Sequence, residues 1–156
     1  MDLKKAFGRV PRQLLFYKLY KCGVRGKMFR VIKDIYTKNK ARVLIGKNLS
    51  PEFEIQSGVL QGSKLGPVLF LIFINDLLDK LNESNYGVKI EDLKISSLGF
   101  ADDIVLTCDS PSKLQSLINI CSEWAAQNCM EFQTTKCKVM VLTHSSTNLS
   151  FTLNNE

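Results

Sequence analysis

Apolar residues recur every three or four positions along four stretches of the chain, which is the spacing that one face of an α-helix requires. The predicted helices span about residues 11–22, 26–38, 67–81 and 111–128. Pro11, Pro67 and Pro111 each lie in the first turn of a predicted helix, where a proline is tolerated. The apolar run at residues 68–74 is too short to span a bilayer, so it predicts a buried helix segment.

Short runs of apolar and β-branched residues lie between these helices and predict β-strands. We expect a stub of strand at residues 1–4, strands at 41–45 and 52–55 around a turn, one or two strands within 88–100, one strand up to residue 107, and a last strand at 138–142. Helices that alternate with a few antiparallel strands are typical of an α+β domain. We therefore predict a small antiparallel sheet with helices packed on one face.

The charges are distributed unevenly. Residues 1–50 contain 14 Lys and Arg against 2 acidic residues, whereas residues 51–156 contain 7 against 13. A basic segment of this density commonly binds a polyphosphate. We expect residues 4–47 to form a nucleic-acid-binding surface, although ordinary solvated helix faces would give the same counts.

The five cysteines form no Cys-x-x-Cys pair, and the only histidine is His144, which argues against a zinc site. We expect reduced, mostly buried thiols with no disulfide partner. The N-terminus has no signal-peptide hydrophobic region, and no apolar run is long enough for a transmembrane helix. We therefore expect an intracellular protein of the nucleus or cytoplasm that is not secreted and has no membrane partner.

Two adjacent carboxylates, Asp102 and Asp103, lie between two short apolar runs within residues 98–106. The flanking residues favour a hairpin with an acidic turn. Adjacent carboxylates repel each other, and each requires water or a cation. Oxygen ligands on a rigid turn suit Mg²⁺, which takes one or two protein carboxylates plus substrate phosphates. An ordinary acidic surface turn would contain the same pair, so the remaining motifs must decide between the two interpretations.

Three further motifs accompany the Phe-Ala-Asp-Asp segment in a particular order. Asp2 opens Asp-x-x-x-Ala-Phe, Gln61-Gly62 lies in Gly-Val-Leu-Gln-Gly-Ser-Lys-Leu-Gly-Pro, and Lys136 follows two threonines. In this order and spacing they resemble the palm of reverse transcriptases, most closely the non-LTR (LINE-like) retrotransposon type. The resemblance implies a ferredoxin-like (RRM-like) palm core over residues 1–143. It also implies that residues 144–156 are a polar tail that starts a further region.

The resemblance implies an RNA-directed DNA polymerase that transfers nucleotides with two Mg²⁺ ions, for which Mn²⁺ can substitute. Its partners would be an RNA template, a DNA primer and dNTPs. Asp2, Asp102 and Asp103 would be the catalytic metal ligands, with Asp103 in a supporting role. The backbone carbonyl of Leu3 would add a ligand. Lys136 would donate a proton to pyrophosphate, unless it is simply an exposed lysine.

The resemblance also assigns nucleotide contacts. Phe7 would be an aromatic gate under the incoming sugar, where a flat ring excludes a 2′-hydroxyl. Gln61 offers donor and acceptor groups to the nucleotide, and Gly62 allows close backbone approach. A core phenylalanine and a simple glycine turn are the plain alternatives.

The chain departs from the family pattern in three places. Gly8 and Gln133 stand where relatives usually have Asp and Asn. The chain also begins at Met1-Asp2, so nearly all of the first palm strand and the fingers would precede it, and the thumb would follow Glu156. We therefore expect a palm fragment truncated at both ends, which alone extends a primer far more slowly than an intact enzyme.

Three alternatives stay open at this point. A non-catalytic, nucleic-acid-binding remnant would keep the palm pattern without polymerase activity. A plain ferredoxin-like domain with an acidic turn would lack the Gln-Gly loop. An RNA-dependent RNA polymerase palm would carry a sugar-accepting polar residue in place of Phe7.

Overall fold

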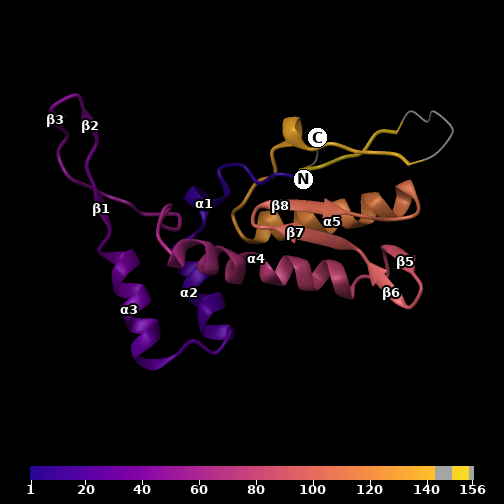
Figure 1. Cartoon of the computed structure of the whole chain (residues 1–156), viewed down its shortest axis with the longest axis horizontal. Coiled ribbons are helices and arrows are strands. Elements are labelled where there is room, and N and C mark those ends of the chain that lie inside the picture. Colours follow the sequence, from indigo (N-terminus) through magenta and orange to yellow (C-terminus); the bar gives the residue numbers. More distant parts are fainter. Residues whose placement is uncertain (143–148, 155–156) are drawn as a thin grey trace. The chain divides into compact units, whose positions relative to one another are not determined.

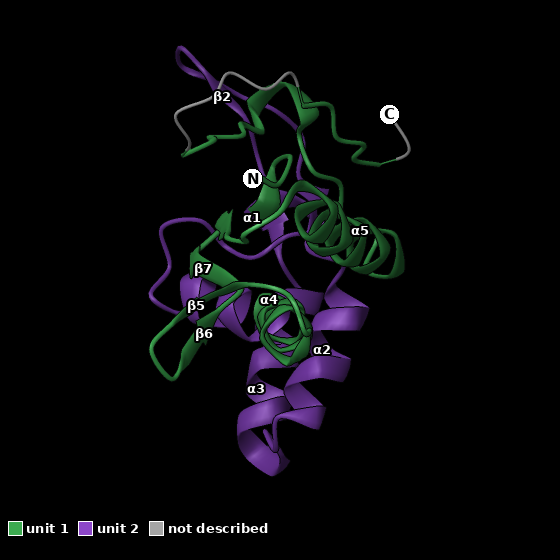
Figure 2. Ribbon diagram, turned by 90° about the vertical axis from the view of Figure 1, so that its right-hand side faces the viewer, with its two compact units in different colours: residues 1–6, 74–156 green, residues 7–73 purple. Residues whose placement is uncertain are grey.

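The computed structural model describes residues 1–142 and 149–154, and the chain divides into two compact units (Figure 2). Unit 1 contains residues 1–6 and the chain from residue 74 onward, and unit 2 contains residues 7–73. The long helix α4 (Leu65–Glu83) begins in unit 2 and ends in unit 1. The expected boundary at residues 143/144 falls outside the described residues.

Helices form the body of unit 2 (Figure 1). They are α1 (Ala6–Arg9, whose first residue belongs to unit 1), α2 (Arg12–Lys21), α3 (Gly26–Thr37) and the start of α4. The three longer helices agree with the predicted positions. Their apolar faces bury Leu15 and Leu19 from α2, Tyr36 from α3, and Phe70 and Phe73 from α4. These side chains form the core of unit 2.

A β-hairpin arm connects α3 to the loop before α4. Its base pairs β1 (Lys40–Ala41) with β4 (Phe53–Glu54), and its tip pairs β2 (Leu44–Ile45) with β3 (Asn48–Leu49). The two strands expected here are confirmed in outline. The tip is tighter than expected because Gly46, with a φ of 62°, allows a two-residue turn.

Unit 1 combines two hairpins with two helices. The hairpins are β5 (Val88–Ile90) with β6 (Leu93–Ile95), and β7 (Ser97–Phe100) with β8 (Asp103–Leu106). The helices are the second part of α4 and α5 (Pro111–Gln127), followed by a 3₁₀ turn at Thr134–Lys136. Trp124 of α5 is fully buried, and its indole nitrogen donates a 2.9 Å hydrogen bond to Asp76 of α4.

The start of the chain forms a short central strand of unit 1. Asp2 pairs with Asp103 on one side, and Leu3 pairs with Phe132 on the other, both antiparallel. The last strand expected at 138–142 is wrong, because these residues form no regular secondary structure. The partner of the N-terminal segment is instead the short stretch 131–133.

The expected α+β class is confirmed, but one continuous sheet is not observed. In the described part of the chain the named strands form four two-stranded ladders. The expectation of mostly buried thiols is wrong, since Cys121 is buried whereas Cys22 and Cys129 are exposed. Within the described residues, no helix combines the length and apolar character needed to cross a membrane.

Candidate functional site: an acidic pair and a glutamine-glycine loop

The register of the N-terminal strand brings two of the candidate carboxylates together in unit 1. The nitrogen of Met1 donates to the carbonyl of Ile104 over 2.6 Å, and the nitrogen of Ile104 donates back over 3.0 Å. The next pair, Asp2 and Asp103, therefore faces across the ladder without hydrogen bonds between its backbones. Side chains of such pairs are the closest in an antiparallel ladder, with Cα atoms about 4.5 Å apart.

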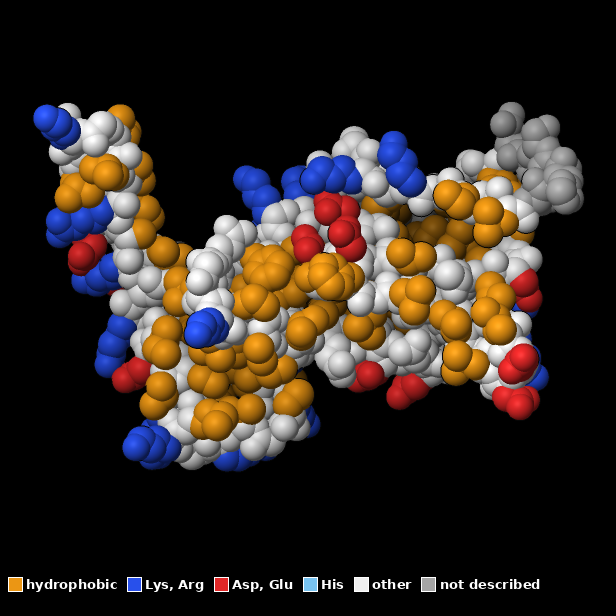
Figure 3. Space-filling view, viewed as in Figure 1, with side chains coloured by type: hydrophobic (Ala, Val, Ile, Leu, Met, Phe, Trp, Pro, Cys, Tyr) orange, Lys and Arg blue, Asp and Glu red, His pale blue; other side chains and the backbone are white. Residues whose placement is uncertain are grey.

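Strand alternation places this acidic pair on the solvent side. Leu3 and Ile104 are almost fully buried, with exposed fractions of 2% and 1%. Neighbouring residues point to the opposite face of a strand, so Asp2 and Asp103 share the other face. Figure 3 shows acidic side chains gathered at the tip of the β7–β8 hairpin on the face that it draws. The sequence folds here so that core packing of the apolar residues presents both carboxylates to solvent.

Asp102 lies in the hairpin turn rather than in the ladder. Phe100 pairs with Asp103, which leaves Ala101 and Asp102 as a two-residue connection. Ala101 has a φ of 53°, the left-handed conformation that such tight turns require. Asp2 therefore faces Asp103 across the ladder, and Asp102 is adjacent to that pair along the chain.

The backbone of Leu3 is oriented toward the same turn. The backbone of Met1 is hydrogen-bonded to β8. On the opposite edge, the backbone carbonyl of Asp2 accepts a 2.9 Å hydrogen bond from the nitrogen of Gln133, and the backbone nitrogen of Lys4 donates one of 2.9 Å to the carbonyl of Glu131. Backbone groups alternate between the two edges of a strand, so those of Leu3 face the β8 side, as those of Met1 do. This edge is where a carbonyl ligand beside Asp102 would have to lie.

Lys136 contacts the acidic pair from the segment on the other side of the N-terminal strand. Its Nζ lies 3.4 Å from Oδ2 of Asp2, with side-chain exposed fractions of 60% and 23%. The 3₁₀ turn at Thr134–Lys136 follows Gln133, whose backbone bonds to Asp2. The same pairing that fixes Asp2 thus brings the lysine to its carboxylate.

The acidic pair has the donor chemistry that Mg²⁺ prefers, because this ion is commonly held by one or two carboxylates plus substrate phosphates. Among residues 1–142 and 149–154, no group of three or more His, Cys, Asp or Glu side chains is close enough together to hold a metal ion. The three aspartates therefore do not form a ready-made cage. A pair of opposed carboxylates fits an ion whose other ligands come from substrate.

Unit 2 contains the other predicted residues. Phe7 stacks on Phe70 with ring centroids 4.5 Å apart and an interplanar angle of 18°. Gln61 and Gly62 lie in the turn between residue 60 and α4, and both are exposed. Gly62 has a φ of 82°, so the turn requires a residue that adopts the left-handed conformation.

Sequence reasoning missed two residues that organise this loop, Arg12 and Tyr36. Both are buried, with exposed fractions of 7% and 0%, and both bond to the backbone just before Gln61. The available signal was weak, because an arginine beside Pro11 looks like an ordinary exposed residue of the first helical turn. Only the fold reveals which carbonyl groups the guanidinium meets.

The chain matches the family model described as "Reverse transcriptase (RNA-dependent DNA polymerase)" over residues 1–153. It belongs to the reverse transcriptase family. The match begins before the acidic pair and extends beyond the 3₁₀ turn, so it contains every residue of the candidate site. The expectation drawn from the motifs is thereby confirmed at the level of the family.

Curated relatives place the reverse transcriptase chain among non-LTR elements. It is 32% identical over 110 residues to the "Retrovirus-related Pol polyprotein from type-1 retrotransposable element R2" of Popillia japonica, covering 70% of the chain and 18% of the relative. The R2 polyprotein of Nasonia vitripennis is 29% identical over 93% of the chain and 14% of the relative. The "RNA-directed DNA polymerase from mobile element jockey" of Drosophila funebris is 28% identical over 93% of the chain and 16% of the relative. The chain thus spans less than a fifth of the length of these relatives.

Proposed function

We propose that this reverse transcriptase chain is the palm of an RNA-directed DNA polymerase, where divalent metal and the incoming dNTP bind. The single observation that carries the proposal is the register that sets Asp2 opposite Asp103, and the family match supports it. Two carboxylates in direct opposition destabilise a ladder, and the exposed ammonium group of Lys136 beside Asp2 offsets only part of their repulsion. A bound cation therefore relieves a cost that the fold itself creates.

The resemblance assigned the metal to Asp2 and Asp102, with Asp103 as a supporting or second carboxylate. Because the register sets Asp103 opposite Asp2, we propose instead that Asp2 and Asp103 would hold the metal, with Asp102 and the carbonyl of Leu3 as further ligands at the turn. When bound, Mg²⁺ or Mn²⁺ would lower the pKa of the primer hydroxyl and offset charge on the leaving pyrophosphate. Lys136 balances the charge of Asp2 before the substrate arrives, and its ammonium group is suited to donate a proton to the departing phosphate.

The loop and the aromatic ring of unit 2 would select the nucleotide. Stacking on Phe70 fixes the orientation of the Phe7 ring, and a ring that excludes a 2′-hydroxyl must have a fixed orientation. Gln61 is exposed next to a glycine, so its amide can reach a ligand that approaches the backbone closely. The proposed partners are an RNA template, a DNA primer and dNTPs.

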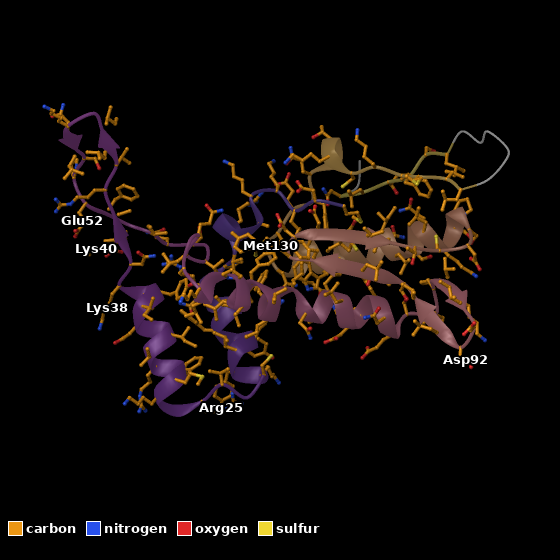
Figure 4. All side chains as sticks on the ribbon, in the orientation of Figure 1. Arg25, Lys38, Lys40, Glu52, Asp92 and Met130 are labelled. Carbon is orange, nitrogen blue, oxygen red and sulfur yellow. The ribbon has the colours of Figure 1, made fainter. Side chains whose placement is uncertain are left out.

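The basic residues of 4–47 would contribute to the nucleic-acid surface. Lys and Arg side chains lie at several places along the hairpin arm and near the ends of α3, among apolar and other side chains (Figure 3). Some of this charge is compensated, since Lys40 lies 2.9 Å from Glu52 at the base of the arm (Figure 4). We propose an intracellular location, in the nucleus or cytoplasm, where nucleic acid and dNTPs are present.

Metal-dependent binding of dNTP tests the proposal. Calorimetric titration of the whole chain with dATP should detect binding in Mg²⁺ and none in EDTA. Asp2→Asn and Asp103→Asn should each weaken the binding at least tenfold, because each removes a charged metal ligand. The matched control is Asp92→Asn, which removes a carboxylate from the tip of the β5–β6 hairpin in the same unit (Figure 4).

A non-catalytic, nucleic-acid-binding remnant is the second candidate, favoured by the absence of a three-ligand cluster among the described residues. It predicts binding of single-stranded RNA that is the same in Mg²⁺ and in EDTA, together with no detectable binding of dATP. That pair of results would contradict the polymerase proposal.

A further inference from the structure

We propose that Arg12 and Tyr36 are positioning residues, which together clamp the Gln61–Gly62 loop to the segment that carries Phe7 and thereby set the discrimination between deoxy- and ribonucleotides. This inference rests on the proposed function of Phe7 and Gln61. It concerns residues of unit 2 alone. Neither clamp residue contacts the nucleotide in this account, and each acts through the backbone.

The guanidinium of Arg12 meets several backbone carbonyl groups at once. Its Nε donates to the carbonyl of Gly58 over 3.1 Å, and its two terminal nitrogens donate to the carbonyls of Tyr36, Ile55 and Ser57. Three of these four acceptors lie in the stretch 55–58, which leads directly into the nucleotide loop. Charge-assisted bonds from a rigid planar fork fix the backbone more firmly than neutral bonds do.

The side chain of Arg12 is buried beside the ring of Tyr36. Its guanidinium carbon lies 5.4 Å from the centre of the Tyr36 ring, and burial lowers the pKa of the group. Burying a cation is costly unless hydrogen bonds compensate it. Three of the four bonds of this buried arginine go to the stretch 55–58, so the cost of burying the cation is offset mainly by fixing this stretch.

Tyr36 extends the clamp by one step toward the loop. Its ring is fully buried in the core of unit 2, and its hydroxyl accepts a 3.3 Å hydrogen bond from the backbone nitrogen of Leu60. Leu60 is the residue immediately before Gln61. The last backbone group before the proposed nucleotide contact is thus anchored to a side chain that cannot move without disturbing the core.

The same stretch is joined to the segment of Phe7. Val59 donates a 2.8 Å backbone hydrogen bond to the carbonyl of Phe7, and Gly58 donates one of 2.9 Å to Val10. The backbones of these two segments approach so closely that a Cβ on Gly58 would lie 2.7 Å from the carbonyl oxygen of Gly8. Backbone hydrogen bonds therefore join the segment that carries the Phe7 ring to the stretch that leads into the Gln61–Gly62 loop.

Amide hydrogen exchange tests the clamp itself. Tyr36→Phe removes only the hydroxyl, so the amide of Leu60 should exchange roughly tenfold faster while the midpoint of global unfolding stays nearly unchanged. Tyr20→Phe, at an exposed tyrosine of α2, is the matched control and should change nothing. Arg12→Lys keeps the charge but loses the fork, so the backbone amides of Ser57–Leu60 should exchange faster.

Nucleotide selectivity tests the positioning role. The ratio of the dissociation constants for ATP and dATP, measured on the whole chain with Mn²⁺, should fall roughly three- to tenfold in Tyr36→Phe and in Arg12→Lys. A variant that was merely less stable would lose affinity for both nucleotides equally, and the ratio would stay constant. Tyr20→Phe should keep the ratio of the unmodified chain.

The outcomes separate the two levels of the account. An unchanged Leu60 exchange rate in Tyr36→Phe overturns the clamp, and faster exchange with an unchanged selectivity ratio overturns the positioning role. Either result leaves the proposed function intact. Failure of the unmodified chain to bind either nucleotide contradicts the proposed function, and with it the positioning role.

Discussion

Two aspartates that face each other across an antiparallel ladder repel, and the chain tolerates this at Asp2 and Asp103. The hydrogen bonds of Met1 with Ile104 and the buried Leu3 keep the strands in this register. The ion pair with Lys136 offsets only part of the repulsion, because the lysine side chain is largely exposed to solvent. At the residue scale the acidic pair is therefore a local instability that a divalent cation can remove.

Removing one carboxylate should stabilise the metal-free chain. Asp103→Asn is expected to raise the free energy of unfolding in EDTA by about 0.5 kcal/mol, because it ends the opposition of like charges. In Mg²⁺ the unmodified chain should gain stability and the variant should gain little. Urea denaturation in both buffers measures these differences. Asp92→Asn is the control, and a variant that is less stable than the unmodified chain in EDTA would contradict the account.

Cys121 predicts a loss of stability in alkali. Burial raises the pKa of its thiol from the ordinary 9.0 to about 12, so the folded state favours the protonated form. This contribution is complete below pH 9 and is lost as the pH rises from 9 toward 12, at up to about 1.4 kcal/mol per pH unit. Urea denaturation near pH 8 and near pH 10 should show a smaller decrease for Cys121→Ala than for the unmodified chain. Equal decreases in the free energy of unfolding would contradict a raised pKa of the Cys121 thiol in the folded state.

At the scale of elements, the start of α4 fixes the end of the Gln61–Gly62 loop. The hydroxyl of Ser63 accepts a 2.9 Å hydrogen bond from the nitrogen of Gly66, as a capping residue does. A Cβ on Gly66 would lie only 2.4 Å from the carbonyl oxygen of Leu60. The helix can therefore begin here only because residue 66 has no side chain.

Gly66→Ala should for this reason destabilise the chain by about 2 kcal/mol or more, since the backbone of the loop must shift. Gly8→Ala is a matched control, because a Cβ on Gly8 would meet nothing within 4 Å. Its effect should stay within about 0.5 kcal/mol. Thermal or urea unfolding distinguishes the two variants. Similar stabilities would contradict the close approach of Gly66 to the carbonyl oxygen of Leu60.

The helices could be predicted from the sequence because helical spacing is a local signal, and α2, α3 and α5 begin and end close to the expected residues. Strand pairing is not local. The apolar stretch 138–142 has the composition of a strand but has no ladder partner among the residues that the structure describes. Phe132 pairs with Leu3, but it lies in a segment too short to be recognised as a strand. The register of a ladder depends on such distant partners.

The candidate site follows the same division. Its residue types and order were readable from the sequence, and they led to the family. That Asp2 faces Asp103, and that Lys136 contacts Asp2, depends on the register of a central strand only a few residues long. The buried role of Arg12 depends on carbonyl groups from two separate stretches of unit 2, the end of α3 and residues 55–58. No local pattern encodes either arrangement.

At the scale of the whole molecule, the excess of basic residues in the first third of the chain predicts salt-sensitive binding of nucleic acid. The affinity for single-stranded RNA should fall about 10- to 100-fold between 50 mM and 200 mM salt, as a few phosphate contacts require. Lys27→Glu with Arg30→Glu, on exposed positions of α3, should weaken binding more than Lys89→Glu with Lys94→Glu on the β5–β6 hairpin. Both double variants change the net charge equally. Fluorescence anisotropy measures the affinity of the unmodified chain at both salt concentrations and the affinities of the two double variants. Equal losses of affinity in the two variants would show that the basic segment is not the binding surface.

The central claim is that Asp2 and Asp103 form the core of a divalent-metal site, and paramagnetic broadening by Mn²⁺ tests it most directly. In a nuclear magnetic resonance titration of the isotope-labelled chain, substoichiometric Mn²⁺ should first broaden the amide signals of residues 2–3 and 102–104. Excess Mg²⁺ should restore these signals, and Asp103→Asn should abolish the selective effect. Broadening centred on another acidic part of the chain, or the same pattern in Asp103→Asn, would contradict the account.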